Sequence, residues 1–168
     1  LIAKAPTKYA NTIVRTSVNH VSASARQATF EENAEFIESI EILATLDTRT
    51  SDICKGYDGQ TFPIDSGPRP PFHPNCRSTI IPVVKPFTKL KTKEQVRVPE
   101  TKRASMTGEV SGKTSYGSWL KKQSAAIQDE ALGPTRGAMF REGKLNVTDL
   151  KDKFGDALAL PAIYKRLN

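Results

Sequence analysis

The sequence is poor in the residues that build several common classes of site. It has two cysteines, Cys54 and Cys76, and two histidines, His20 and His73, among 168 residues. Two cysteines are too few for the disulfide framework of a small secreted domain. No apolar run approaches the roughly 20 residues of a membrane span, and no signal peptide is visible. We therefore expect no membrane partner.

Apolar residues are also scarce, at 38% of the chain, whereas there are 11 prolines and 10 glycines. This composition predicts long irregular connections around a single modest core. The first residue, Leu1, is not methionine. We therefore expect a fragment, a processed chain or part of a longer one, and what precedes Leu1 is left open.

The net charge of +7 is concentrated in one segment. Residues 85–103 hold seven basic and two acidic side chains, and residues 85–114 show no helical or strand period. The segment predicts an extended basic linker or arm that contacts DNA or an acidic protein surface, or that is simply solvated. The candidate contact residues are Lys85, Lys89, Lys91, Lys93 and Arg97.

The region before residue 84 predicts a helix and a small antiparallel sheet. Helical spacing of apolar residues predicts one long helix over residues 7–34 that covers a face of the sheet. Three β-branched runs, at residues 40–45, 60–64 and 78–83, predict the strands, and Asp58-Gly59 is typical of a hairpin turn. The apolar positions of the helix are Tyr9, Ile13, Val18, Val21, Ala25 and Ala28.

A proline-rich loop between the second and third strands carries the candidate site. Cys54, His73 and Cys76 have the spacing C-x18-H-x2-C, and thiolate and imidazole are ligands that zinc prefers. A structural zinc site needs a fourth ligand, so a disulfide and two reduced, partly buried thiols stay open as alternatives. In each case the three residues fasten the loop to the sheet, helped by an ion network of Asp47, Arg49, Asp58 and Arg77.

Catalysis is not favoured by this loop, and we assign no catalytic residue. His73 precedes Pro74 and lies three residues from Cys76, which places the imidazole in a rigid turn. No glycine-rich strand-to-helix turn supplies an oxyanion site beside it. An enzyme resembling a nuclease or an ADP-ribosyltransferase, using His73 with nearby Arg or Asp, stays open as an alternative.

From residue 115 onward the sequence predicts short helices punctuated by capping residues. Ser115 is a good N-cap, Gly133-Pro134 ends one helix and starts another, and Trp119 is the expected packing anchor. The predicted fold class is thus α+β. Its three parts are an α+β domain at residues 1–84, the basic arm at 85–114 and a helical subdomain at 115–168.

Two groups of residues resemble the phage Mu F-like minor head protein family. The first group is residues 44–51, Cys54, residues 57–63 and residues 70–78, preceded by a helix that resembles the family's own. The second is residues 116–123, 128–130 and 132–143, which resemble a segment found after the motif in many members. Ser51 stands where many members have the first cysteine of a C-x2-C pair.

The resemblance implies a non-enzymatic structural protein of a tailed phage or prophage head. The resemblance also implies that the protein acts in head morphogenesis, is assembled in the host bacterial cytoplasm and ends in the virion. It implies portal or major capsid subunits as partners, with other copies of the chain and packaged DNA as further candidates. No cofactor is implied, although zinc on Cys54, His73 and Cys76 stays open.

Overall fold

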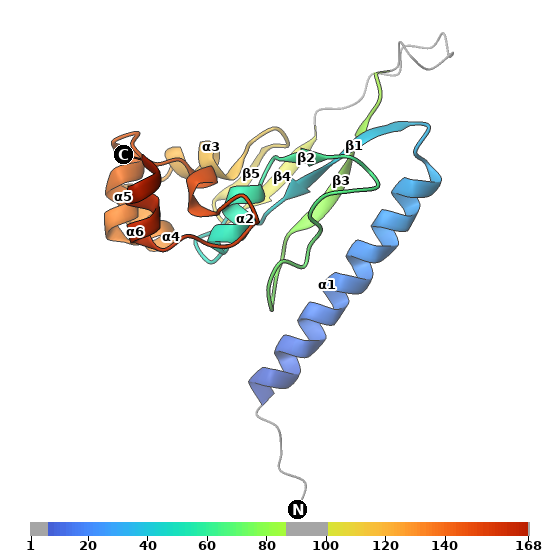
Figure 1. Cartoon of the computed structure of the whole chain (residues 1–168), viewed down its shortest axis with the longest axis horizontal. Coiled ribbons are helices and arrows are strands. Elements are labelled where there is room, and N and C mark those ends of the chain that lie inside the picture. The colour runs from blue at the N-terminus through green and yellow to red at the C-terminus, as the bar shows by residue number, and fades with distance from the viewer. Residues whose placement is uncertain (1–6, 87–100, 168) are drawn as a thin grey trace, which may run out of the picture. The chain divides into compact units, whose positions relative to one another are not determined.

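The computed structural model describes residues 7–86 and 101–167 (Figure 1). The chain forms two compact units. The first unit contains residues 7–43 and 60–86, and the second contains residues 44–59 and 101–167. Helices and small antiparallel sheets make the fold α+β, as predicted. The predicted domain limits at residues 84 and 114 differ from this division, because the chain leaves the first unit after Leu43 and returns at Gln60.

A three-stranded antiparallel sheet forms the centre of the first unit. Its order is β2 (Thr61–Phe62), β1 (Ile37–Leu43) and β3 (Thr79–Val84). Ile40 in the middle strand pairs with Phe62 on one side and Pro82 on the other. Proline is tolerated at this position because β3 is an edge strand among the described residues. The three predicted strands are confirmed.

A register shift in β1 sets which of its residues are buried. Ile37 pairs with Val84 and Ser39 pairs with Val83, so one extra residue of β1 lies between them. In a regular strand Ile37 and Ile40 would point to opposite faces. The bulge brings both side chains into the interior, where they are 7% and 0% exposed.

The long helix α1 spans Thr7–Glu32, close to the predicted residues 7–34. It contacts β3, and its buried residues are Ala23 and Phe30. The face predicted to cover the sheet is instead exposed, which corrects that part of the prediction. The face of α1 that points inward instead carries polar residues that bond to the loop before β3. The exposed residues are Tyr9, Ile13, Val18, Val21, Ala25 and Ala28.

The second unit is mainly helical. Its elements are α2 (Asp52–Tyr57), β4 (Lys102–Ser105), β5 (Gly108–Ser111), α3 (Tyr116–Lys121), α4 (Ala125–Leu132), α5 (Pro134–Arg141), the 3₁₀ turn η2 (Val147–Leu150) and α6 (Leu160–Leu167).

Local capping sets the limits of these short helices. The side chains of Ser115 and Ser124 accept hydrogen bonds from the backbone of α3 and α4 at their N-termini. Gly133, at φ 81°, ends α4 and allows Pro134 to begin α5. The predicted helix starts and stops of this region are confirmed.

The core of the second unit forms around Trp119 and Tyr116, which are 1% and 0% exposed. Their rings meet edge to face at 5.3 Å between centroids. Short helices are marginal alone, so this shared core is what stabilises them. The other core residues are Leu46, Leu120, Ala131, Leu132, Phe140, Leu145, Leu150 and Ile163.

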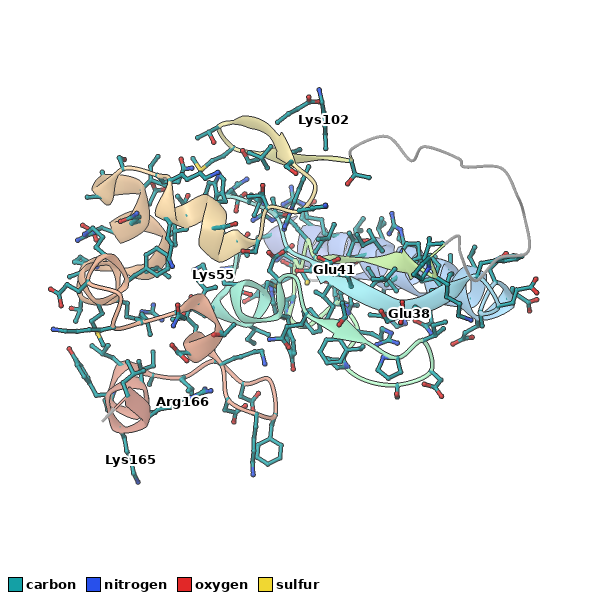
Figure 2. All side chains as sticks on the ribbon, turned by 90° about the horizontal axis from the view of Figure 1, so that it is seen from above. Glu38, Glu41, Lys55, Lys102, Lys165 and Arg166 are labelled. Carbon is teal, nitrogen blue, oxygen red and sulfur yellow. The ribbon has the colours of Figure 1, made fainter. Side chains whose placement is uncertain are left out.

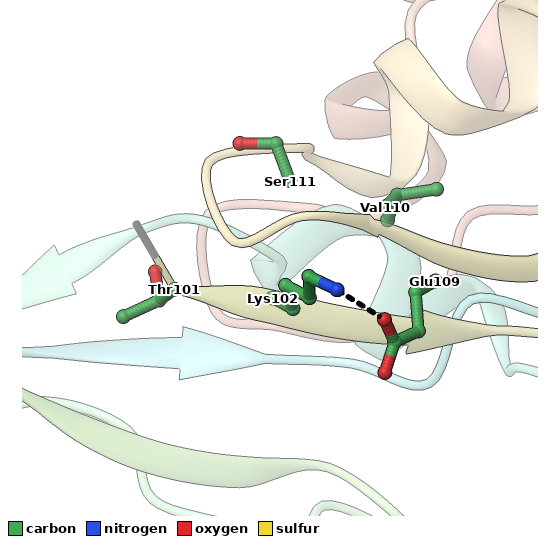
Figure 3. A pocket seen from close by; sticks show the side chains of 5 residues that line it. All are labelled: Thr101, Lys102, Glu109, Val110 and Ser111. Atoms are coloured by element: carbon green, nitrogen blue, oxygen red, sulfur yellow. Dashed lines mark hydrogen bonds and ion pairs between the residues drawn. The ribbon is translucent and has the colours of Figure 1, made fainter. Parts of the chain in front are cut away.

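The end of the predicted basic arm is a β-hairpin rather than an extended linker. β4 and β5 pair antiparallel, with Ser105 opposite Gly108 across a two-residue turn. Lys102 on β4 forms an exposed 2.8 Å ion pair with Glu109 on β5 (Figure 3). The extended linker was predicted because the two strands are short and rich in charge, which hides their alternation of inward and outward residues. Arg103 and Val110 are the residues that turn inward.

Asp58-Gly59 is also not the hairpin turn that was predicted. Asp58 is the C-cap residue of α2, and Gly59 follows with φ 76°. Glycine adopts this left-handed conformation readily after a helix. Residue 60 then leads into β2, so the pair connects a helix to a strand.

Candidate functional site

The carboxylate of Asp58 is the centre of a buried polar network in the second unit. It accepts hydrogen bonds from the backbone N–H groups of Ala44, at 2.7 Å, and Tyr116, at 2.6 Å. Arg103 donates to both carboxylate oxygens, one of them at 3.2 Å. Arg103 also donates to the carbonyls of Ala44 and Thr114. One ion pair therefore joins α2, the hairpin and the start of α3.

Asp47 organises the turn before α2. Its carboxylate accepts from the Thr50 hydroxyl at 3.0 Å and from the backbone N–H of Arg49 at 3.1 Å. The hydroxyl of Tyr116 donates to the Asp47 carbonyl at 2.7 Å. The Arg49 guanidinium, however, is 81% exposed and 3.9 Å from the carboxylate. A pair this exposed contributes little to stability, so backbone and hydroxyl bonds hold the turn.

A second buried charge cluster lies on α2. Lys55, whose side chain is 3% exposed, donates to Asp52 at 2.8 Å and to the Ala131 carbonyl at 2.5 Å; Figure 2 shows it on the ribbon of α2. The other oxygen of Asp52 accepts from Arg136 at 2.5 Å. The ammonium of Lys55 also lies 6.0 Å from the ring centroid of Tyr116. Arg136 therefore links Asp52 on α2 to α5, and Lys55 links α2 to α4.

The pKa values of Lys55 and Asp52 are both lowered, although burial and charge act against each other in each group. Burial is the largest influence on Lys55 and lowers the pKa of its ammonium, against the attraction of Asp52. For Asp52, burial raises the pKa, but the combined charges and hydrogen bonds of Lys55 and Arg136 outweigh it and leave the pKa lowered. Asp52 therefore stays ionised at neutral pH, as a structural anion.

In the first unit, α1 holds the proline-rich loop by polar bonds. Asn19 donates to the Cys76 carbonyl at 2.5 Å and to the Ser78 carbonyl at 3.4 Å. Asn75, in a left-handed conformation at φ 57°, donates from its backbone to the Thr16 hydroxyl at 3.0 Å. These bonds pin the segment that leads into β3.

Arg69 holds the other half of the loop. It donates to the Gln27 side chain at 2.9 Å and to the carbonyls of Pro63, at 2.8 Å, and Ile64, at 2.9 Å. Gln27 in turn donates to the Ile64 carbonyl at 2.5 Å. Sequence reasoning missed Arg69, because no local pattern indicates that its partners are Gln27 and these carbonyls.

The predicted loop-fastening residues fall in different units. His73, Cys76 and Arg77 lie in the first unit, where the Cys76 backbone N–H donates to the His73 carbonyl at 3.1 Å. Cys54 lies in the second unit, buried in α2. Their association, and a zinc ion on the three, stay predictions.

The remaining predicted contacts are only partly within the described residues. Lys85 donates to the carbonyls of Ala34 and Glu35 at 3.0 and 2.9 Å, so it ties β3 to the turn after α1. Lys89, Lys91, Lys93 and Arg97 lie outside the described residues. Arg103 was the important residue that sequence reasoning missed, since it was counted only as surface charge.

Comparison with known families identifies the N-terminal half of the chain. Residues 2–81 match the family model described as Phage Mu protein F like protein. Over these residues the chain is similar to the Mu F-like family. No curated protein and no solved structure matches the chain.

The Mu F-like match covers α1, β1, α2, β2 and the start of β3. It therefore includes the predicted motif at residues 44–78 and residues from both units. Residues 116–143, also expected to resemble the family, lie outside the matched range. The family is one of phage head-related proteins. Among the described residues, the structure contains no helix with the length and apolar character of a membrane span.

Proposed function

We propose that this protein is a minor structural component of a tailed phage or prophage head. It acts in head morphogenesis near the portal and the capsid, is assembled in the bacterial cytoplasm and stays in the virion. The observation that carries the proposal is the Mu F-like match over residues 2–81.

The buried charges of the second unit support a mechanical role. Asp58, Arg103, Lys55 and Asp52 direct their polar atoms to one another and to backbone groups of the same unit. A catalytic acid or base needs a polar atom within reach of a substrate. These groups instead connect helices and strands, as expected of a part that must resist deformation during assembly.

Mass spectrometry of purified particles tests the proposal directly. The gene is interrupted in its phage or prophage, and particles with and without it are compared for heads, packaged DNA and portal content. We expect the protein in complete particles at a fixed copy number, and defective heads without it. Normal infectious particles that lack the protein would overturn the proposal.

An enzyme that uses His73 is the alternative from another functional class, and a single substitution separates the two. The His73→Ala variant is examined for folding by circular dichroism and for complementation of the interrupted gene. A head protein should complement whenever the variant is folded. A folded variant that assembles normally but fails to complement would favour catalysis.

Binding of packaged DNA is a third hypothesis, based on the net charge of +7. Gel shifts over a salt series should show steep, sequence-independent binding if the basic segment contacts phosphates. The matched variant replaces Lys89, Lys91 and Lys93 by Gln and should flatten the salt dependence. Weak binding without salt dependence would exclude this role.

A further inference from the structure

The long helix α1 turns its polar face toward its own unit. Its less exposed positions recur every three or four residues, and most of them are polar. Thr16, Asn19 and Gln27 bond to the proline-rich loop from this face. The buried and half-buried positions on this face are Thr12, Thr16, Asn19, Ala23, Gln27 and Phe30, and Ser22 is half-buried beside it.

The opposite face of α1 carries an apolar stripe that its own unit leaves exposed. Val14, Val18 and Val21 are 60%, 60% and 66% exposed, and the exposed Ala25 and Ala28 continue the spacing. At about 100° per residue, the centre of this stripe lies about 180° around the helix from the centre of the inward face. A helix of a soluble domain normally buries its apolar stripe, so this arrangement is inverted.

The spacing of the stripe matches a coiled-coil seam. Steps of four, three, four and three residues separate its members from Val14 to Ala28, which is the alternation of a heptad repeat. Asn11 and Glu32 would be the next members and are polar, so the seam spans about 21 Å. A seam of this length predicts a weak, reversible contact.

Side-chain size makes the stripe complementary to itself in one orientation. Its N-terminal part holds the three valines, and its C-terminal part holds Ala25 and Ala28. In one antiparallel register Val18 lies opposite Ala28 and Val21 opposite Ala25, so that large and small side chains alternate across the seam. In the other register Val14 lies opposite Ala25. Two parallel copies would place alanine opposite alanine and leave that end poorly packed.

Charge selects the same orientation. Lys8 and Arg15 lie in the N-terminal half of α1, and Glu31 and Glu32 lie in its last turn, all exposed. Both antiparallel registers that keep the heptad spacing bring the partner's Glu31 beside Lys8 or Arg15. Parallel copies would bring like charges together at each end.

From this geometry we propose that α1 is a self-association surface, on which a second copy of this chain packs its own α1 antiparallel about a two-fold axis. The contact buries the stripe formed by Val14, Val18, Val21, Ala25 and Ala28. It does not depend on the head-protein assignment, because the argument uses only the sequence and contacts of the first unit.

Sedimentation of the full chain over an about hundredfold concentration range tests the proposal. We expect a monomer–dimer equilibrium, and Val18→Glu should raise the dissociation constant at least about tenfold, because it places an unpaired charge in the seam. His20→Glu is the matched control, since His20 is exposed on α1 but lies outside the stripe. A chain that stays monomeric throughout, or equal effects of the two variants, would overturn the proposal.

Cysteine cross-linking tests the orientation. Ala28→Cys should not form a disulfide with itself, because antiparallel copies keep the two positions apart. It should link to Asn11→Cys in one register or to Val18→Cys in the other when the variants are mixed. Self-linking of Ala28→Cys, or no link in either mixture, would contradict antiparallel pairing.

Discussion

Arg103 contacts both carboxylate oxygens of Asp58, a residue 45 positions earlier in the chain. Their side chains are 8% and 0% exposed. The pair joins the helix at the Mu F-like motif to a hairpin beyond the matched residues. Residues 44–59 thus pack with the C-terminal half of the chain, although they lie within the range that matches the family.

Removing the cation of this pair should strongly destabilise the second unit. Arg103→Met leaves Asp58 buried and ionised without its partner, and we expect a loss of about 3 to 5 kcal/mol in the free energy of unfolding. Urea denaturation, monitored by the fluorescence of Trp119, measures this loss.

The neighbouring pair provides the control for Arg103→Met. Lys102→Met breaks an ion pair whose members are 70% and 68% exposed, and it should cost less than about 1 kcal/mol. The double variant with Asp58→Asn should be more stable than Arg103→Met alone, because the buried charge is gone. Similar losses for Arg103→Met and Lys102→Met would refute the structural role.

Asp52 should make stability depend on acidic pH. Its pKa in the folded chain lies below the usual 3.8, because Lys55 and Arg136 outweigh the opposing effect of burial. Its contribution is therefore present above the unfolded value and is lost as the pH falls through the folded pKa. We expect Asp52→Asn to reduce stability at neutral pH and to lessen the acid sensitivity below about pH 4. If the free energies of unfolding of Asp52→Asn and of the unsubstituted protein changed with pH in parallel, this role of Asp52 would be ruled out.

Asn19→Ala should loosen the loop before β3. The change removes both side-chain hydrogen bonds to the carbonyls of Cys76 and Ser78, at a cost of about 1 to 3 kcal/mol. Hydrogen exchange at residues 73–79 should accelerate, while exchange in α3 to α6 is unchanged. Ser17→Ala, an exposed change on the same helix, should leave the loop as it is. Unaltered exchange in the Asn19 variant would show that another contact holds the loop.

The two thiols should react slowly in the native protein. Cys54 and Cys76 are 2% and 4% exposed, so reagents reach them only after local opening. Thiol labelling in denaturant, with released zinc measured in parallel, then distinguishes the three alternatives. Two labelled thiols without zinc indicate reduced cysteines, two labelled thiols with zinc indicate a metal site, and no labelled thiol indicates a disulfide. Rapid labelling of both cysteines before unfolding is the outcome that the structure forbids.

Local signals in the sequence predicted much of the fold. The cap Ser115 and the pair Gly133-Pro134 act within one turn of the chain, so short helices could be located from sequence. The β-branched runs also placed the strands of the first unit correctly. These features need only neighbouring residues, which is why they could be predicted.

Partners distant in sequence were not predictable in the same way. The burial of Arg103 depends on Asp58, and the Asp58 carboxylate also accepts hydrogen bonds from the backbone of Ala44 and Tyr116. No local pattern encodes which cation meets which carboxylate, because desolvation and geometry of the assembled unit decide it.

The orientation of α1 shows most clearly what the sequence determines and what the tertiary structure determines. By itself the sequence determined that residues 7–32 form a helix with an apolar stripe, since that follows from spacing alone. Tertiary structure decided that the stripe faces outward, because Asn19 and Gln27 donate hydrogen bonds from the opposite face to backbone carbonyls of the loop. A periodic pattern shows that two faces differ, and only the surrounding contacts determine which face is turned inward.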